Sequence, residues 1–184
     1  MSDFSCSYHL RTECFDDCVN LIKRANVIGY VFPLRNGWVS FVINEPDFTF
    51  SKKLIDANDG IILNFINAED HGWSFEIYSK SHRVCNFECE FGMTDDFDFV
   101  SETSHGVYVE KWEELFDNKQ SLILAKAFKI NDKSLPEEVI SADDFADGMG
   151  LYFYEWIAYN YISRNFNAFT TYGEYENLKI IEVK

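Results

Sequence analysis

The sequence predicts an α+β fold, in which a mostly antiparallel sheet with a packed N-terminal helix is followed by a mainly helical C-terminal half. Three observations predict it. Residues 14–25 carry apolar side chains at helical spacing, residues 27–91 contain β-branched, aromatic or alternating segments, and helical spacing returns after residue 106. Because 47% of the 184 residues are hydrophobic, we expect one core and a single domain over 1–184. The alternative is a sheet-rich subdomain over 1–93 beside a helix-rich one over 106–184.

The N-terminal elements are a short strand in "SYHL" and an amphipathic helix in "ECFDDCVNLIKRAN". Carboxylates lie at the start of this helix and Lys23 and Arg24 lie at its end, which is the arrangement that the helix dipole favours. Its apolar face carries Cys14, Phe15, Cys18, Leu21, Ile22 and Ala25.

The next segments predict strands joined by short connections. "VIGYVFPL" and "WVSFVI" flank Asn36-Gly37, a pair that tolerates positive φ and favours a hairpin, and Pro33 places its strand end at an edge or near the turn. "EPDFTFSKKLIDANDG" predicts a loop with a short helix. "IILNFIN", "WSFEIYSK" and "SHRVCNFECEF" predict three more strands. The apolar residues that share a face within each strand are Ile61, Leu63 and Phe65, then Trp73, Phe75 and Ile77, then Cys85, Phe87, Cys89 and Phe91.

After these strands, "TDDFDFVSETSHG" is predicted to be an acidic loop and the seam between the two halves. "GVYVEKWEELF" and "SLILAKAFKI" predict helices, and Ser134 to Glu137 fits a capping box that opens another helix, which "GMG" ends. "LYFYEWIAYNYISRNF" predicts a further helix, and "NLKIIEVK" a closing strand. The helix that begins at the capping box is expected to bury Val139, Ala142, Phe145, Ala146 and Met149.

The formal net charge of −15 restricts the partners of the chain. Such a field repels phosphate backbones and anionic membrane surfaces, so we expect neither nucleic acid nor membrane as a partner. It attracts a basic protein, although it also serves to keep an aromatic-rich chain in solution. The start of the sequence lacks the pattern of a secretory signal, no apolar run reaches about 18 residues, and the five cysteines are an odd number, so we expect free thiols and a cytoplasmic location.

The stretch "NAEDHGW" gathers Glu69, Asp70 and His71 beside Trp73. A carboxylate beside an imidazole can act as an acid–base pair or ligate a metal, and His105 or His9 could add to such a site. Neighbouring residues of an extended chain point in opposite directions, however, and the spacing brings no further ligand to this point. We therefore predict a polar turn in which Gly72 relaxes the backbone, and no metal or cofactor.

Three other groups of residues suggest chemistry. The Cys14/Cys18 and Cys85/Cys89 pairs could make a four-thiolate zinc site, but each pair falls on one apolar face, so core packing explains the four thiols better. The acidic run 95–98 lacks the ligand spacing of a calcium loop and is expected to be solvated, or else a docking strip anchored by Phe97 and Phe99. The aromatic cluster of 152–161 belongs either to a covered core or to an interaction surface. Signatures of the GxxxxGK, GxGxxG, GxSxG and HExxH types do not occur.

"VIGYVFPLRNGWVSFVI", "IILNFINAEDHGWSFEIY" and "GMGLYFYEWIAYNYI" together resemble a family of uncharacterised bacterial cytosolic proteins. The resemblance covers most of the chain through aromatic, structural motifs, and it implies no active-site residue. In its small, acidic, aromatic-rich composition the chain is also similar to immunity proteins that neutralise intracellular toxins.

The leading functional prediction is a non-enzymatic acidic binding protein, of the immunity type or another, that docks a basic protein. Its contacts are expected to centre on Trp73, Asp95, Asp96, Asp98, Tyr154 and Trp156. One alternative is a metal- or acid–base-dependent enzyme that uses Glu69, Asp70, His71 and His105. A second alternative is an apolar-ligand pocket lined by the late aromatic segment.

Overall fold

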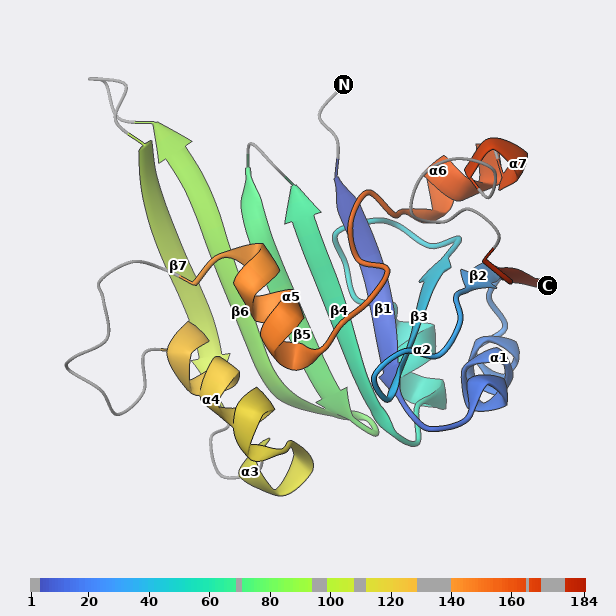
Figure 1. Cartoon of the computed structure of the whole chain (residues 1–184), viewed down its shortest axis with the longest axis horizontal. Coiled ribbons are helices and arrows are strands. Elements are labelled where there is room, and N and C mark those ends of the chain that lie inside the picture. Colours follow the sequence, from blue (N-terminus) through green and yellow to red (C-terminus); the bar gives the residue numbers. More distant parts are fainter. Residues whose placement is uncertain are drawn as a thin grey trace.

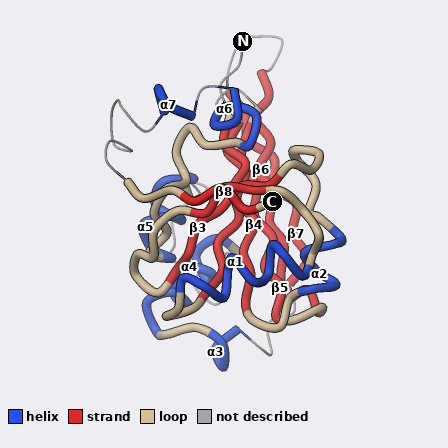
Figure 2. Tube along the Cα trace, turned by 90° about the vertical axis from the view of Figure 1, so that its right-hand side faces the viewer, coloured by secondary structure: helices blue, strands red, loops and turns tan. Residues whose placement is uncertain are grey.

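The computed structural model of the chain describes residues 4–68, 71–93, 99–107, 112–128, 140–164, 166–169 and 178–184, with the backbone alone at 92–93, 99–107 and 168–169. The strands form one eight-stranded antiparallel sheet in the order β7-β6-β5-β4-β1-β3-β2-β8 (Figure 1). This confirms the α+β class and the mostly antiparallel sheet. Both faces of the sheet carry helices, with α4 and α5 on one side and α2 on the other (Figure 2).

The elements follow one another along the chain with these bounds. The strands are β1 (Ser5–Arg11), β2 (Gly29–Val31), β3 (Trp38–Ile43), β4 (Ile61–Ala68), β5 (Gly72–Ser79), β6 (His82–Met93), β7 (Phe99–Val107) and β8 (Ile181–Val183). The helices are α1 (Phe15–Arg24), α2 (Lys52–Ala57), α3 (Trp112–Leu115), α4 (Asn118–Ala127), α5 (Ala142–Met149), α6 (Tyr159–Arg164) and α7 (Phe166–Phe169).

The alternation of side chains divides the core between the two faces of the sheet. On the front face, the apolar residues predicted for β4, β5 and β6 pack against α3, α4 and α5 in a single buried cluster. On the back face, a second cluster joins β1, β3 and Ile62 to α1 and α2. A third, smaller cluster joins Tyr30, Phe32 and Val42 to α6 and the residues before β8. The buried faces that the sequence predicted for β4, β5 and β6 are therefore confirmed.

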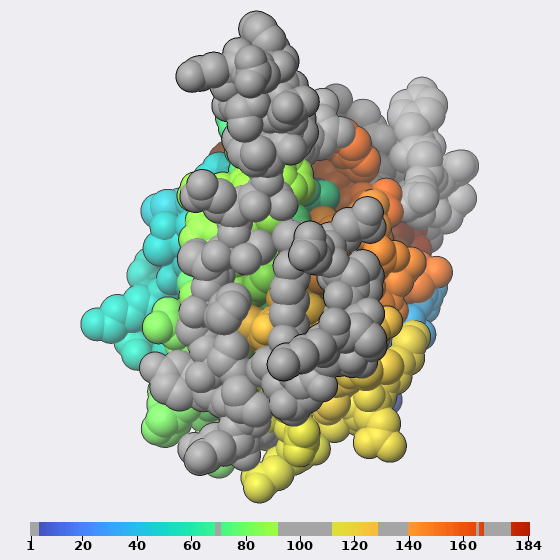
Figure 3. Space-filling model, turned by 90° about the vertical axis from the view of Figure 1, so that its left-hand side faces the viewer, coloured from blue at the N-terminus to red at the C-terminus, as the bar shows by residue number. Residues whose placement is uncertain are grey.

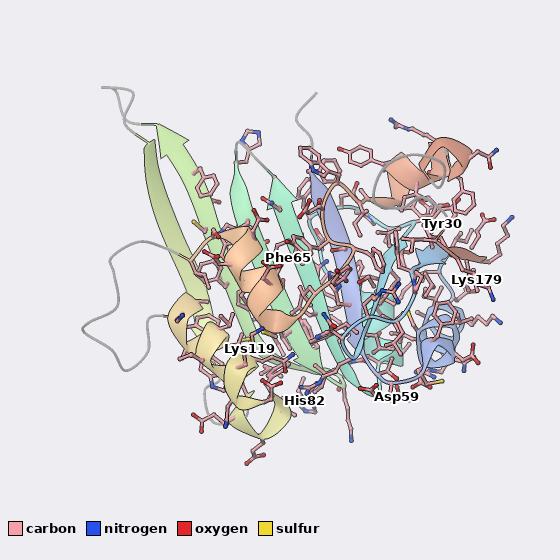
Figure 4. The ribbon with its side chains drawn as sticks, viewed as in Figure 1. Tyr30, Asp59, Phe65, His82, Lys119 and Lys179 are labelled. Carbon is pink, nitrogen blue, oxygen red and sulfur yellow. The ribbon has the colours of Figure 1, made fainter. Side chains whose placement is uncertain are left out.

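Phe145 of α5 lies at the centre of the front cluster and is fully buried. Its ring centroid lies 4.1 Å from that of Phe75, 5.4 Å from Trp73 and 6.2 Å from Phe65, which Figure 4 shows beneath α5. Aromatic rings in such offset arrangements add to the free energy that their buried area supplies. This ring therefore joins the helical layer of the C-terminal half to the sheet of the N-terminal half.

The local signals of the N-terminal half are confirmed. Asn36 and Gly37 adopt φ of 49° and 75° in the hairpin between β2 and β3. The helix in "ECFDDCVNLIKRAN" and the short helix after Phe50 form as α1 and α2. At the other end of the chain, the predicted closing strand forms as β8. Among the described residues no helix is long and apolar enough to cross a membrane.

The acidic loop predicted over 94–106 is wrong for residues 99–106, because these belong to β7. That strand pairs antiparallel with β6 from Cys85↔Val107 to Met93↔Phe99. Its sequence, "FVSETSHGV", is too polar to show an apolar alternation, and a strand at the edge of a sheet does not require one. Residues 94–98 lie outside the described part of the chain.

The helix predicted over 151–166 is also wrong in its first half. Residues 151–158, which we name the strap, cross the front face without helical structure, and α6 begins only at Tyr159. Phe153 and Trp156 adopt positive φ of 54° and 55°. A helix would have spread the apolar side chains around its whole circumference, whereas the strap buries Leu151, Tyr154, Ile157 and Ala158 and leaves Tyr152, Glu155 and Trp156 exposed.

The helix before the strap forms, but it begins later than the capping box suggests. α5 starts at Ala142, and the side chain of Ser141 accepts a 3.1 Å hydrogen bond from Asp144 N as its N-cap. Gly150 ends it in the left-handed conformation, with φ of 76°, which confirms the role predicted for "GMG". Ser134, Pro136 and Val139 lie outside the described residues. α3 and α4 confirm the helices predicted after residue 106 within the ranges that the structure describes.

Candidate functional site

On the back face of the sheet, Ile62, Asn64 and Ile66 of β4 are buried, whereas the described side chains at a hollow on β5 and β6 are partly or fully exposed. The described helices of this face, α1 and α2, pack at the β1–β3 end and leave the other end uncovered (Figure 1). Here the surface holds a hollow of about 410 Å³, which we name the acid-lined hollow, and a smaller one of about 140 Å³ beside it. The acid-lined hollow is lined by Phe48, Ile66, Ala68, His71, Gly72, Trp73, Ser74, Glu88, Cys89, Glu90 and Phe91.

The strand register explains why carboxylates gather at this place. Ile66 pairs with Ser74 and Ser74 with Glu88, while Gly72 pairs with Glu90 in the next row. Because directly paired residues share a face, Glu88 and Glu90 stand side by side on β6 above the small residues of β5. Both glutamates are exposed. The hollow thus has an acidic wall and a floor of small side chains.

Glu76 adds a third carboxylate beside the smaller hollow. Its Oε2 accepts a 3.2 Å hydrogen bond from the Tyr78 hydroxyl and lies 3.8 Å from Arg83 Nη1. Its register partners are Asn64 and Asn86, so polar side chains continue across three strands. Such a surface offers hydrogen-bond acceptors and negative charge to a ligand.

Phe48 is the exposed aromatic residue that lines the acid-lined hollow, and both Phe48 and Glu88 line the two hollows. Phe48 lies in the connection between β3 and α2, has a positive φ of 64°, and remains 54% exposed. Figure 3 looks at the β7 edge and shows residues near 45–60, in cyan, on one side of the green β6, with the yellow and orange helices on the other. One side of the Phe48 ring meets Phe4 at a centroid distance of 4.8 Å.

The hollow is also lined by the described residues at the end of β4 and the start of β5, Ala68, His71 and Gly72. His71 is exposed there, whereas Trp73 is only 3% exposed and packs on Phe87 in the front core. Gly72 has φ of 123°, and a Cβ at this position would meet the Cys89 carbonyl oxygen at 1.9 Å. The predicted role of Gly72 in relaxing the backbone is therefore confirmed.

The other residues of the predicted catalytic set are placed less fully. Glu69 and Asp70 lie outside the described residues, and His105 is described by its backbone, which pairs with Phe87. Of the four candidates, only His71 has a described side chain, and it lies at the hollow. In the part of the chain that the structure describes, no group of three or more His, Cys, Asp or Glu side chains could hold a metal ion.

The predicted docking residues are divided between the core and the surface. Tyr154 is buried, and its ring meets Phe65 at 5.5 Å, while Trp156 is 48% exposed on the strap, on the face opposite the hollow. Burial raises the pKa of the Tyr154 hydroxyl, and Asp143, Glu155 and Asp147 raise it further. Asp95, Asp96 and Asp98 lie outside the described residues. A docking role for these residues stays a prediction.

The cysteines follow the packing interpretation with one exception. Cys18, Cys85 and Cys89 are buried, and burial raises the pKa of each thiol. Cys14 is exposed, so its predicted burial is wrong. It is the N-cap residue of α1 and adopts extended backbone angles, which turn it out of the apolar face of the helix. Cys6, which the predicted pairs omitted, is buried, and desolvation raises its pKa to about 11.

We expect Cys14 to react with a thiol reagent far faster than the other four cysteines of the native protein. The thiolate is the reactive form, and burial of the other thiols both blocks access and disfavours ionisation. Titration with a chromogenic disulfide at pH 8 should give one fast equivalent, and four more after denaturation. Cys14→Ser should abolish the fast equivalent, whereas Cys89→Ser should retain it. A fast phase that survives Cys14→Ser would contradict this placement.

A buried serine–histidine network crosses the front face of β1 and β3 and was not predicted. His9 is fully buried; its Nε2 lies 2.9 Å from Ser7 Oγ and its Nδ1 lies 2.9 Å from Ser40 Oγ. Ser40 Oγ donates its proton to the Tyr152 carbonyl at 2.5 Å, so His9 Nδ1 donates to Ser40 and Ser7 donates to Nε2. Desolvation lowers the pKa of His9 to about 3 and keeps the ring neutral.

This network pairs a hydroxyl with an imidazole, as a nucleophile and its base are paired, but all three side chains are sealed from solvent. It holds the strap against the sheet, because Ser40 binds the Tyr152 carbonyl and Cys6 N donates to the Ile157 carbonyl at 2.8 Å. The sequence signal that could have found it is the polar face of β1, where Ser5, Ser7 and His9 alternate with apolar residues. The buried network thus joins the strap to the sheet, and the acid-lined hollow is a concave surface that a ligand could enter.

The acid-lined hollow is lined by groups that suit the binding of a ligand. It presents carboxylates, small hydroxyl and backbone groups, and an exposed aromatic ring to one space. These groups suit a cation with an apolar part. No family model, curated protein or solved structure matches the chain.

Proposed function

We propose that the protein is a non-enzymatic acidic binding protein that docks a basic polypeptide segment in the acid-lined hollow. One observation carries the proposal: Glu88 and Glu90 line an open concave surface of about 410 Å³ on a half of the sheet that the described helices do not cover. A hollow of this size suits a bound side chain together with part of its backbone. Polar strand residues continue the surface beyond the hollow, as a bound extended segment requires.

The charge of the whole chain supports a basic partner. A net charge of −15 speeds encounter with a positively charged protein and opposes encounter with nucleic acid. It also opposes a second copy of the chain at this place, because two such faces would bring Glu88 and Glu90 against the same residues of the partner copy. A basic polypeptide brings opposite charge to these carboxylates, whereas a second copy would bring like charge.

An immunity-type role in the cytoplasm is the form of this proposal that fits the remaining features. Immunity proteins act by occupying a partner and require no catalytic group. The acidity, the surplus of aromatic residues and five free cysteines are compatible with such a role. A toxin whose binding surface carries lysine and arginine side chains is the corresponding partner.

Neutralisation of the acidic wall tests the proposal. The probe is a fluorescent peptide of about eight residues in which lysine and serine alternate, matched to the two-residue period of the strand face. We expect the double variant Glu88→Gln, Glu90→Gln to weaken its binding about tenfold at low ionic strength, since each exposed ion pair contributes about 0.2–1 kcal/mol. Fluorescence anisotropy at low and physiological salt measures the change.

The matched control is the double variant Asp147→Asn, Glu155→Gln, which also removes two exposed carboxylates, from α5 and the strap on the other face. It alters the net charge of the protein but leaves the hollow intact, so it should weaken binding less than twofold. Equal loss of affinity in the control and in the hollow variants would show that the peptide senses only the overall charge, and would refute the proposed site.

A further inference from the structure

We infer that the acid-lined hollow selects arginine over lysine, with the guanidinium held between the Phe48 ring and the carboxylate of Glu88. The inference rests on the proposed function and names the side chain that the site recognises. Phe48 and Glu88 come from separate parts of the chain, the β3–α2 connection and β6, and both line the two hollows. A flat cation placed between an aromatic wall and an acidic wall can satisfy both at once.

The Phe48 ring, which forms the aromatic wall, is positioned by its backbone conformation and by neighbouring rings. Phe48 holds a positive φ of 64°, a conformation that costs a non-glycine residue free energy, yet its ring remains 54% exposed. Phe4 meets the Phe48 ring at 4.8 Å and Tyr161 meets Phe4 at 5.3 Å, so two further rings support this wall. With Phe4 against one part of the ring, the remaining part is presented to the hollow.

The acidic wall suits a guanidinium better than an ammonium. Glu88 and Glu90 are two residues apart on β6, so their side chains leave the same face of the strand from backbone positions about 7 Å apart. A guanidinium offers five N–H donors in a rigid plane and binds a carboxylate through two of them. An ammonium is compact and strongly hydrated, and it gains less from stacking on an aromatic ring.

Other residues of the hollow can contact the methylene groups of an arginine side chain. Ile66 and Ala68 line it with apolar surface against which the methylene groups can pack. Ser74, the register partner of Glu88, adds a hydroxyl at the floor. The site thus combines an apolar base, an aromatic wall and a carboxylate wall.

The test compares three peptides that differ only at the central residue of the alternating probe, which is arginine, lysine or citrulline. We expect the arginine peptide to bind the wild-type protein about tenfold more tightly than the lysine peptide. The citrulline peptide keeps the planar shape but lacks the charge, and we expect it to bind more weakly than both. Fluorescence anisotropy of each peptide gives the ratio.

Phe48→Leu removes the ring and keeps an apolar side chain at the same backbone angle, so the strain is unchanged. We expect it to reduce the arginine-to-lysine ratio to about one while the affinity for the lysine peptide stays within twofold. The matched control is Leu122→Ala, which changes a 56% exposed apolar residue of α4 and should keep the ratio. Equal thermal unfolding of Phe48→Leu and the wild type confirms that the variant is folded.

The outcomes separate this inference from the proposed function. Tight binding of the lysine and arginine peptides with equal affinity would overturn the arginine preference and leave the acidic docking site standing. A preference for arginine that persists in Phe48→Leu would show that the Phe48 ring does not cause the preference, and would also overturn the inference. Failure of both peptides to bind would overturn the proposed function together with the inference.

Discussion

Replacement of Phe145 by alanine is expected to lower the free energy of unfolding by about 3–5 kcal/mol, the usual cost of deleting a buried phenylalanine ring. The ring is fully buried at the centre of the front cluster. It stacks on Phe75 at 4.1 Å and on Phe65 at 6.2 Å. Alanine would leave a cavity between α5 and the sheet, and the short helix α5 has few means to close it.

Urea unfolding followed by tryptophan fluorescence and by circular dichroism measures this loss. Leu122→Ala is the control, because Leu122 is 56% exposed and its truncation should change stability by less than about 0.5 kcal/mol. We expect one transition with both probes, since Phe145 and the sheet share a core over the single predicted domain 1–184. Two transitions, of which Phe145→Ala shifts only one, would favour the separate subdomains 1–93 and 106–184.

Acidification from pH 7.5 to pH 5 is expected to destabilise the protein by about 2 kcal/mol through His9 alone. Burial lowers the pKa of this imidazole in the folded protein to about 3, against 6.5 for the ordinary group. Between these two values the unfolded chain binds a proton that the folded protein does not. The stability is therefore complete above pH 6.5, and the contribution of His9 falls by up to 1.4 kcal/mol for each pH unit below it.

His9→Gln is the variant that isolates this effect, because an amide can hydrogen-bond to Ser7 and Ser40 without titrating. The variant should be less stable than the wild type at pH 7.5, so the informative quantity is the change in unfolding free energy between pH 7.5 and pH 5. We expect this change to be smaller in the variant by about 2 kcal/mol. His71→Gln, at an exposed position, is the control and should follow the wild type. If the unfolding free energy of His9→Gln changed with pH as much as that of the wild type, His9 would not be the cause of the acid destabilisation.

The correct predictions came from signals that act within one element. The alternation of Cys85, Phe87 and Cys89 fixed the buried face of β6, because side chains of a strand point to opposite faces in turn. Asn36 and Gly37 specified the hairpin through their tolerance of positive φ. In α1 the spacing of Cys18, Leu21 and Ile22 specified the buried face of the helix.

The wrong predictions concern places where tertiary contacts override such signals. Residues 151–158 carry enough apolar side chains for a buried helix, yet they cover the sheet as a non-helical strap whose bends and turn bury Leu151, Tyr154, Ile157 and Ala158 and expose the polar and aromatic remainder. β7 is polar, and it forms because β6 offers unpaired backbone groups along its whole length. Cys14 fits the helical spacing, but the helix begins one residue after it.

The sequence by itself determined the α+β class, most strand faces, the first helix and the acidic character of the surface, because periodicity, turn chemistry and charge are properties of neighbouring residues. Only the tertiary structure decided where a ligand could bind. The acid-lined hollow unites Phe48 with Ser74, Glu88 and Glu90 through strand register and through the end of the sheet that α1 and α2 leave open. The spacing of these residues along the chain does not predict that they lie together, because their proximity depends on which strands pair and which face remains uncovered.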